Sequence, residues 1–287
     1  MIYLWIVSLI WAFSFGLIKG QLTGLPSNYV TLIRMGLAFF VFLPFFRLSA
    51  FNKKDLLKLF ALGAIQFGCM YILYIQSYQY LKGHEVALFT ITTPFFVTLI
   101  YDVFQKKFHP WALLMVLVCL AGSSVMKYSE IQRDDFWFGF FLIQLANLCF
   151  ALGQVGYKKL FEGKALDHKQ AFAPMFLGGV CVALLAVFVT QTSYVPPSSK
   201  QWLVLIYLGV LSSGVCFFLW NLGATKAKAG TLAIMNNMKI PLAILCSVLF
   251  FGEQTNITTL AIGTVLIFLA LFGATKPIKK ITSRKLR

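Results

Sequence analysis

The chain of 287 residues is 59% hydrophobic and only 12% charged, and its mean hydropathy is +0.81. A water-soluble domain of this length does not have such a composition, so a soluble enzyme and a soluble binding module are excluded. The net charge of +16 does not indicate a nucleic-acid partner, because the basic residues lie in short connections between apolar runs. In such positions they set membrane orientation and contact anionic lipids.

Ten apolar segments of membrane-spanning length follow one another along the chain. Because these runs are continuous and do not alternate with polar residues, we expect helices rather than the strands of a membrane barrel. Their approximate boundaries are residues 2–18, 29–46, 56–79, 84–104, 109–126, 136–157, 171–190, 201–224, 230–251 and 257–274. The sequence therefore predicts an all-α integral membrane protein with ten transmembrane helices, located as a multi-pass protein in a cell membrane (the bacterial inner membrane). We interpret the first run as a span and not as a removed signal peptide.

Lys and Arg are unevenly divided between the two sets of connections. If the N-terminus is cytoplasmic, eighteen of them lie inside and five outside, while Arg34 and Lys239 lie within spans. Since cytoplasmic connections are enriched in Lys and Arg, the sequence predicts that both termini are cytoplasmic. Residues 276–287 then form a basic cytoplasmic tail.

An internal repeat divides the chain into two halves. Gly83 and Pro94 recur as Gly230 and Pro241, and both pairs are separated by eleven residues. The predicted halves of five helices each are residues 1–127 and 136–275. Because five is odd, the second half must enter the membrane in the opposite orientation. Inverted repeats are typical of secondary transporters, whose substrate site lies near the midplane between the halves.

Several short motifs stand in a particular order along both halves. They are Trp11-Ala12-Phe13-Ser14-Phe15 with Lys19, Leu25-Pro26-Ser27 with Arg34 and Ala38, Tyr80-Leu81 with Ala87 and Pro94, and Gly230 and Pro241 with Phe251-Gly252-Glu253 and Gly263. Together they resemble the drug/metabolite transporter superfamily, EamA type, over nearly the whole chain. This resemblance implies a carrier with ten helices in an inverted repeat, and a central cavity lined by helices 1, 3, 4, 6, 8 and 9.

Lys239 is predicted to lie deep in the ninth span. It is nine residues from Gly230, which is about 13 Å along a helix. An ammonium group at that depth costs on the order of 2.5–3.5 kcal/mol. No Asp or Glu lies at a comparable depth in another apolar segment, so we expect the counter-charge to come from a substrate. Asn236 lies one turn away on the same face and is the natural second polar group. The alternative is a structural lysine that snorkels or binds carbonyl groups near Pro241.

Polar and aromatic residues of other spans complete the predicted substrate site. Gln144 and Asn147 share one face of the sixth span, where they either line a cavity or form hydrogen bonds between helices. Tyr71 and Tyr74 share a face of the third span, and buried tyrosine hydroxyl groups need partners. The remaining predicted substrate contacts are Trp11, Ser14, Trp220 and Asn221.

Three further residues have ionisable side chains. His84 and Glu85 begin the fourth span at its outer end, where proton coupling and simple capping of the helix are the two interpretations. Arg34 lies about five residues inside the second span, shallow enough to reach the outer interface, so a structural role is expected. No catalytic set, metal-ligand cluster or phosphate-binding loop is present in the sequence, so no metal, cofactor or direct use of ATP is predicted.

The sequence thus favours a secondary active transporter, not an enzyme. It would move a small organic metabolite (an amino acid, a carboxylate or a related anion-bearing solute) across the cytoplasmic membrane by alternating access. An exporter of aromatic or cationic drug-like compounds is the second hypothesis. A membrane-embedded lipid-modifying enzyme or a scaffold is the third. The expected partners are the small-molecule substrate and membrane lipids, with no nucleic acid, and the expected state is a monomer or homodimer.

Overall fold

The computed structural model describes residues 2–105, 114, 135–164 and 166–226, together with scattered positions from 239 to 269. Within these ranges every regular element is helical, and seven helices are long and apolar enough to cross a membrane. The elements are α1 (Ile2–Gln21), α2 (Ser27–Phe42), η1 (Leu43–Phe45), η2 (Leu48–Ala50), α3 (Lys53–Gly63), η3 (Ala64–Cys69), α4 (Met70–Ser77), α5 (Gly83–Phe89), η4 (Thr90–Thr92), α6 (Thr93–Gln105), α8 (Phe136–Phe161), α9 (His168–Val189), α10 (Ser199–Ile206), η5 (Tyr207–Val215) and α11 (Cys216–Lys226).

Seven of the predicted spans are confirmed as long apolar helices, and four of these spans contain a change of helix type, the second at its end, where α2 continues into η1. The chain α3–η3–α4 forms one span, as do α5–η4–α6 and α10–η5–α11. The predicted spans 109–126, 230–251 and 257–274 lie outside the described residues except for scattered positions, and the tail 276–287 lies wholly outside them.

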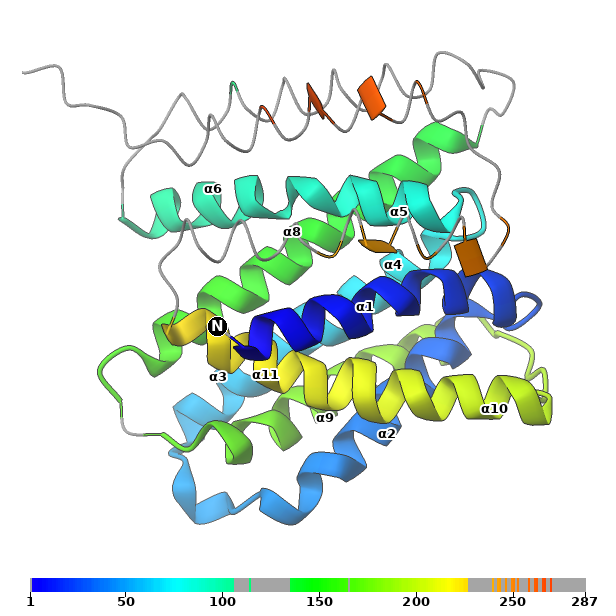
Figure 1. The fold of residues 1–287 in the computed structure, drawn as a ribbon. Coiled ribbons are helices and arrows are strands. Elements are labelled where there is room, and N and C mark those ends of the chain that lie inside the picture. The colour runs from blue at the N-terminus through cyan, green and yellow to red at the C-terminus, as the bar shows by residue number, and fades with distance from the viewer. Residues whose placement is uncertain are drawn as a thin grey trace, which may run out of the picture.

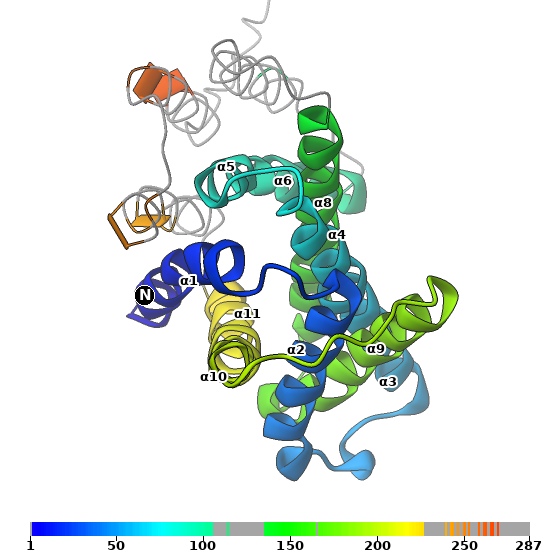
Figure 2. The same cartoon turned by 90° about the vertical axis from the view of Figure 1, so that its right-hand side faces the viewer.

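The connections between successive spans alternate between two ends of the bundle, as Figure 1 shows. α1, α5–α6 and α10–α11 run roughly side by side, while α2 and α8 cross them at a steeper angle (Figures 1 and 2). α8 packs against both α4 and α6, α1 packs against α11, and α2 packs against α9. Apolar side chains such as Phe188 and Leu185 remain exposed on α9, which suits a surface in contact with lipid.

Side-chain caps fix the starts of two spans at opposite ends of the bundle. Asn52 accepts a hydrogen bond from the backbone N–H of Asp55 at 2.8 Å, where α3 begins. Ser198 and Gln201 form a reciprocal capping box where α10 begins. Each cap satisfies backbone N–H groups that have no partner within their own helix.

α3 and α9 cross with their backbones in direct contact. A Cβ atom at Gly63 would overlap the backbone oxygen of Met175, and one at Gly178 would overlap the backbone oxygen of Phe60. Small residues at such crossings let helices approach closely, and close packing is the main source of helix association within a membrane. These two glycines therefore determine how α9 lies on α3.

Two of the spans contain a π-helical segment, η3 and η5. Gly230 lies 147 residues after Gly83, and the same offset of 147 residues places η3 on residues 211–216, which overlap η5 (Tyr207–Val215). A π-helical turn widens the backbone and interrupts the regular i→i−4 hydrogen bonds, so it leaves polar backbone groups for other partners. η5 contributes Ser212 to the lining of the cavity described next, and Met70, the residue after η3, lines the same cavity.

Candidate substrate-binding site

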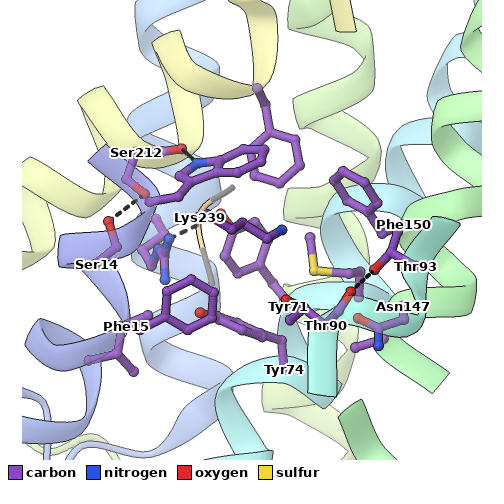
Figure 3. Close-up of a pocket in the computed structure, with 16 residues that line it drawn as sticks. Ser14, Phe15, Tyr71, Tyr74, Thr90, Thr93, Asn147, Phe150, Ser212 and Lys239 are labelled. Atoms are coloured by element: carbon purple, nitrogen blue, oxygen red, sulfur yellow. Dashed lines mark hydrogen bonds between the residues drawn. The ribbon is translucent and has the colours of Figure 1, made fainter. Parts of the chain in front are cut away.

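One cavity lies among the helices and has about 560 Å³ of space between atoms, including its open part. Its lining comes from α1, α2, α4, η4, α6, α8, η5 and α11, and from Lys239. The described residues that line it are Trp11, Ser14, Phe15, Ile18, Arg34, Met70, Tyr71, Tyr74, Thr90, Thr93, Ala146, Asn147, Phe150, Ser212, Phe217 and Lys239 (Figure 3).

The wall of the cavity is mainly aromatic. The ring of Trp11 lies 5.0 Å from that of Phe217 and 6.3 Å from that of Phe150, measured between ring centroids. Tyr71 and Tyr74 form an edge-to-face pair at 6.0 Å. Such rings provide a large, stiff apolar surface for the flat part of a ligand.

Lys239 brings a cation into this aromatic wall. The residue is only 7% exposed. Its Nζ atom lies 5.1 Å from the centroid of the Trp11 ring and 5.9 Å from that of Phe150. An ammonium group is attracted to the face of an aromatic ring, most strongly to tryptophan. The Trp11 and Phe150 rings thus hold the ammonium in the cavity wall.

Trp11 is itself held by the π-helical segment of the eighth span. Its indole Nε1 donates a hydrogen bond to the backbone oxygen of Ser212 at 2.9 Å. The hydroxyl of Ser14 donates to the backbone oxygen of Ile10 at 2.8 Å and lies 3.0 Å from the hydroxyl of Ser212. The widened turn of η5 therefore fixes two of the side chains that the sequence placed in the site.

Arg34 is one of the cavity residues that the sequence interpretation did not place in the site, as are Thr90 and Thr93. It was expected to reach the outer interface, but it is 1% exposed and lies in the cavity wall. Its Nε donates to the hydroxyl of Ser213 at 3.2 Å, and one of its NH2 hydrogens goes to the hydroxyl of Tyr71 at 3.0 Å. The helical face that it shares with Val30 and Ala38, both buried, is the signal that would have placed it.

Asn147 and Gln144 have different positions relative to the cavity. Asn147 lines it, and its Nδ2 donates to the backbone oxygen of Phe89 at 2.8 Å and to the hydroxyl of Thr92 at 2.9 Å. Gln144 accepts from the hydroxyl of Thr92 at 2.6 Å and is not part of the lining. Both side chains join α8 to η4, and Asn147 alone also faces the cavity.

Trp220 and Asn221 lie behind the wall. Trp220 is fully buried, with its ring 5.1 Å from that of Trp11. Asn221 exchanges two hydrogen bonds with Gln66, each at 3.3 Å. Neither residue lines the cavity, and Asn236 lies outside the described residues.

His84 and Glu85 also lie away from the cavity lining. The carboxylate of Glu85 accepts from the backbone N–H of Lys82 at 2.7 Å, which is the geometry of a helix cap. In the part of the chain that the structure describes, no group of three or more His, Cys, Asp or Glu side chains is arranged to hold a metal ion.

Among the described residues, six of the seven membrane-length helices line an aromatic cavity that also contains the buried Lys239, so the fold is that of a multi-pass membrane protein with a candidate site for a small molecule. The chain belongs to the EamA-like transporter family, whose profile matches residues 1–128 and 137–275. It is therefore a small-molecule transporter and not an enzyme.

The chain is also similar to individual proteins. It is 38% identical over 270 residues to the biotin transporter of Escherichia coli K12, and this alignment covers 93% of this chain and 90% of the relative. It is 38% identical over 274 residues to the probable biotin transporter of Pseudomonas aeruginosa PAO1, and this alignment covers 94% of this chain and 96% of the relative. A solved crystal structure at 16% identity has the same fold, with a TM-score of 0.68 over 99% of this chain and 98% of that chain. These relatives are named for biotin and not for an amino acid, so the predicted amino-acid transport is not supported.

Proposed function

We propose that this protein is a secondary active transporter of biotin, or of a closely similar carboxylic acid, across the cytoplasmic membrane. Biotin consists of a compact bicyclic head with a ureido group and a flexible chain that ends in a carboxylate. The relatives at 38% identity supply the name of the solute. The cavity supplies the chemistry that such a solute needs.

The observation that carries the proposal is the position of Lys239 in an aromatic cavity. The ammonium lies over the ring of Trp11 in the wall of the cavity, where a positive charge would attract the carboxylate of a solute that enters. The aromatic wall suits the apolar part of the bicyclic head. The side chains of Thr90, Thr93 and Asn147 line the same space with groups that form hydrogen bonds, which a ureido group requires.

The proposal includes ten helices in two inverted halves, residues 1–127 and 136–275, with both termini in the cytoplasm. The overlap of η3 and η5 under the offset of 147 residues supports this division, because related halves are expected to share such an irregularity. The cavity receives residues from both halves, since Trp11 comes from the first half and Lys239 from the second. Rocking of one half against the other would expose this space to each side of the membrane in turn.

Counterflow in proteoliposomes tests the transport proposal regardless of its natural direction. Vesicles containing the purified protein are loaded with unlabelled biotin and diluted into a trace of labelled biotin. We expect transient accumulation of label that excess biotin abolishes and that a mixture of amino acids leaves unchanged. Accumulation no greater than in protein-free vesicles would overturn biotin as the substrate.

The second hypothesis, export of cationic drugs, is disfavoured by the charge of the cavity. Among the described residues that line it, Arg34 and Lys239 are basic and none is acidic. A cation would be repelled by such a lining, whereas an anion would be attracted.

A further inference from the structure

Arg34 has a feature that its role as a link between helices does not explain. The side chain is 1% exposed, and it joins α2 to η5 through Ser213 and to α4 through Tyr71. These contacts use Nε and NH2. The remaining nitrogen, NH1, is buried and has no hydrogen-bond partner among the described residues.

An arginine nitrogen in this state is costly for the empty protein. A guanidinium group has five N–H donors and cannot lose its charge under ordinary conditions. A buried donor without a partner loses its bonds to water and gains nothing in exchange, and the cost is larger for a charged group. The two N–H groups of Arg34 NH1 are therefore donors of a charged group for which the described residues provide no acceptor.

The orientation of the guanidinium is fixed before any ligand binds. Its central carbon lies 4.4 Å from the centroid of the Tyr71 ring, and hydrogen bonds from Nε to Ser213 and from NH2 to Tyr71 fix the edge of the guanidinium opposite NH1. The Ser213 hydroxyl in turn donates to the Tyr71 hydroxyl at 3.0 Å, which closes a ring of three polar groups. A planar, pre-oriented fork is well suited to a carboxylate.

Arg34 and Lys239 share one cavity but are held by different aromatic rings. Lys239 lies over Trp11 and Phe150, and Arg34 lies over Tyr71. Neither of these contacts supplies a negative charge. None of the described residues that line the cavity supplies one either.

From this arrangement we infer that Arg34 is a second anion-binding residue of the cavity, and that its NH1 donates to the carboxylate of the substrate. The inference rests on the proposed transport of biotin and adds a specificity to it. The cavity selects solutes with a free carboxylate and rejects those in which the same group is an amide or an ester. Conjugates of the vitamin through its carboxyl group are therefore poor substrates.

The test compares biotin with biotinamide, in which a neutral amide replaces the carboxylate. Dissociation constants of both ligands are measured with the purified full-length protein, for the wild type and for Arg34→Gln. Glutamine keeps a hydrogen-bond donor and removes the charge. The exposed Arg47 provides the matched control, Arg47→Gln. Thermal midpoints are recorded for all three proteins to separate binding from folding.

We expect the wild type and Arg47→Gln to prefer biotin over biotinamide, and Arg34→Gln to reduce this preference at least tenfold. If Arg34 is only a link between helices, Arg34→Gln will lower the thermal midpoint and weaken the binding of both ligands equally. An unchanged preference for biotin over biotinamide therefore overturns the inference. If Arg34→Gln does not fold, the same ratio is measured for Arg34→Met, which fills similar space in the helix contact but has neither the charge nor the N–H donors. The same two outcomes then decide.

Failure of the transport proposal has a different signature. If the wild type binds neither ligand, biotin is not the solute, and the assigned specificity falls with it. If the wild type binds both ligands equally, biotin stands as the solute but the carboxylate contact is wrong.

Discussion

The indole nitrogen of Trp11 donates a hydrogen bond to the backbone oxygen of Ser212 at 2.9 Å, although 201 residues separate them in the chain. This bond joins the first span to the π-helical part of the eighth. It presents the face of the indole to Lys239. The aromatic wall is therefore held in place by the backbone of the other half of the chain.

The first prediction concerns Trp11. Trp11→Phe keeps a ring but removes the donor to Ser212, so we expect biotin affinity to fall because the ring is no longer held against η5. Trp11→Ala also removes the ring under Lys239 and should weaken binding further. Equilibrium binding to purified protein gives both values. Trp5→Ala, on the same helix but 45% exposed, is the control and should bind as the wild type does. Equal affinities for all four proteins would contradict the assignment of Trp11 to the site.

The second prediction concerns Lys239. We expect Lys239→Ala to abolish counterflow of biotin while the protein still folds, because removal of a buried charge need not destabilise the empty state. Lys239→Arg should retain partial transport, since it keeps the charge but changes its geometry. Lys226→Ala, at the exposed end of α11, is the control. If Lys239→Ala still distinguishes biotin from biotinamide as the wild type does, Lys239 is a structural lysine.

A third prediction separates two neighbours on α8. Asn147 lines the cavity and Gln144 does not. In a cysteine-free background, Asn147→Cys should react with a small polar thiol reagent, and biotin should slow the reaction. Gln144→Cys should react slowly with and without biotin. Equal rates for the two variants, measured by mass spectrometry of the adducts, would show that the cavity does not end between them.

The fourth prediction tests the close crossing of α3 and α9. A methyl group at Gly178 would overlap the backbone of Phe60, so we expect Gly178→Ala to destabilise the protein by about 1–3 kcal/mol, as overpacking does. Gly36→Ala is the matched control, because no atom lies within 4 Å of the added methyl. It removes a glycine from a helix interior and should be neutral or stabilising. Thermal unfolding in detergent compares them, and a Gly178→Ala midpoint at or above that of Gly36→Ala would contradict the packing argument.

The fifth prediction tests the orientation in the membrane. Ser49 and Ser193 are exposed serines in connections at opposite ends of the bundle. In a cysteine-free background, we expect a membrane-impermeant thiol reagent to label Ser193→Cys in intact cells. Ser49→Cys should be labelled only after the membrane is opened. The reverse pattern would place both termini outside and overturn the proposed orientation.

The sequence predicted the fold well where length and polarity alone decide it. Continuous apolar runs have to be helical in a bilayer because their backbone groups must be satisfied internally. Their boundaries agree with the described helices to within a few residues, as for the run 84–104 and the helix Gly83–Phe104. Lys239 was recognisable for a related reason, since its depth along the ninth run makes a charged group conspicuous.

The sequence predicted the site less well where the direction of a side chain around its helix, or a local change in helix type, decides which groups face the cavity. The depth of Arg34 suggested the interface, but its helical face turns inward with Val30 and Ala38. The backbone oxygen of Ser212 accepts a hydrogen bond from Trp11 because Ser212 lies in a π-helical segment. The residue types of that segment do not predict a π-helical turn. Trp220 and Asn221 are polar enough to suggest a site, yet Trp220 packs behind Trp11 and Asn221 pairs with Gln66.

The π-helical segment η5 also determines the rotational phase of the helix that follows it. Each residue turns an α-helix by about 100°. The wide turn absorbs about one extra residue, so a change of Tyr207–Val215 to a regular α-helix of the same length would rotate α11 by roughly that angle relative to α10. Trp220, now fully buried against Trp11, would then face another direction. The number of residues in η5, and not only their identity, is thus a property of the binding site.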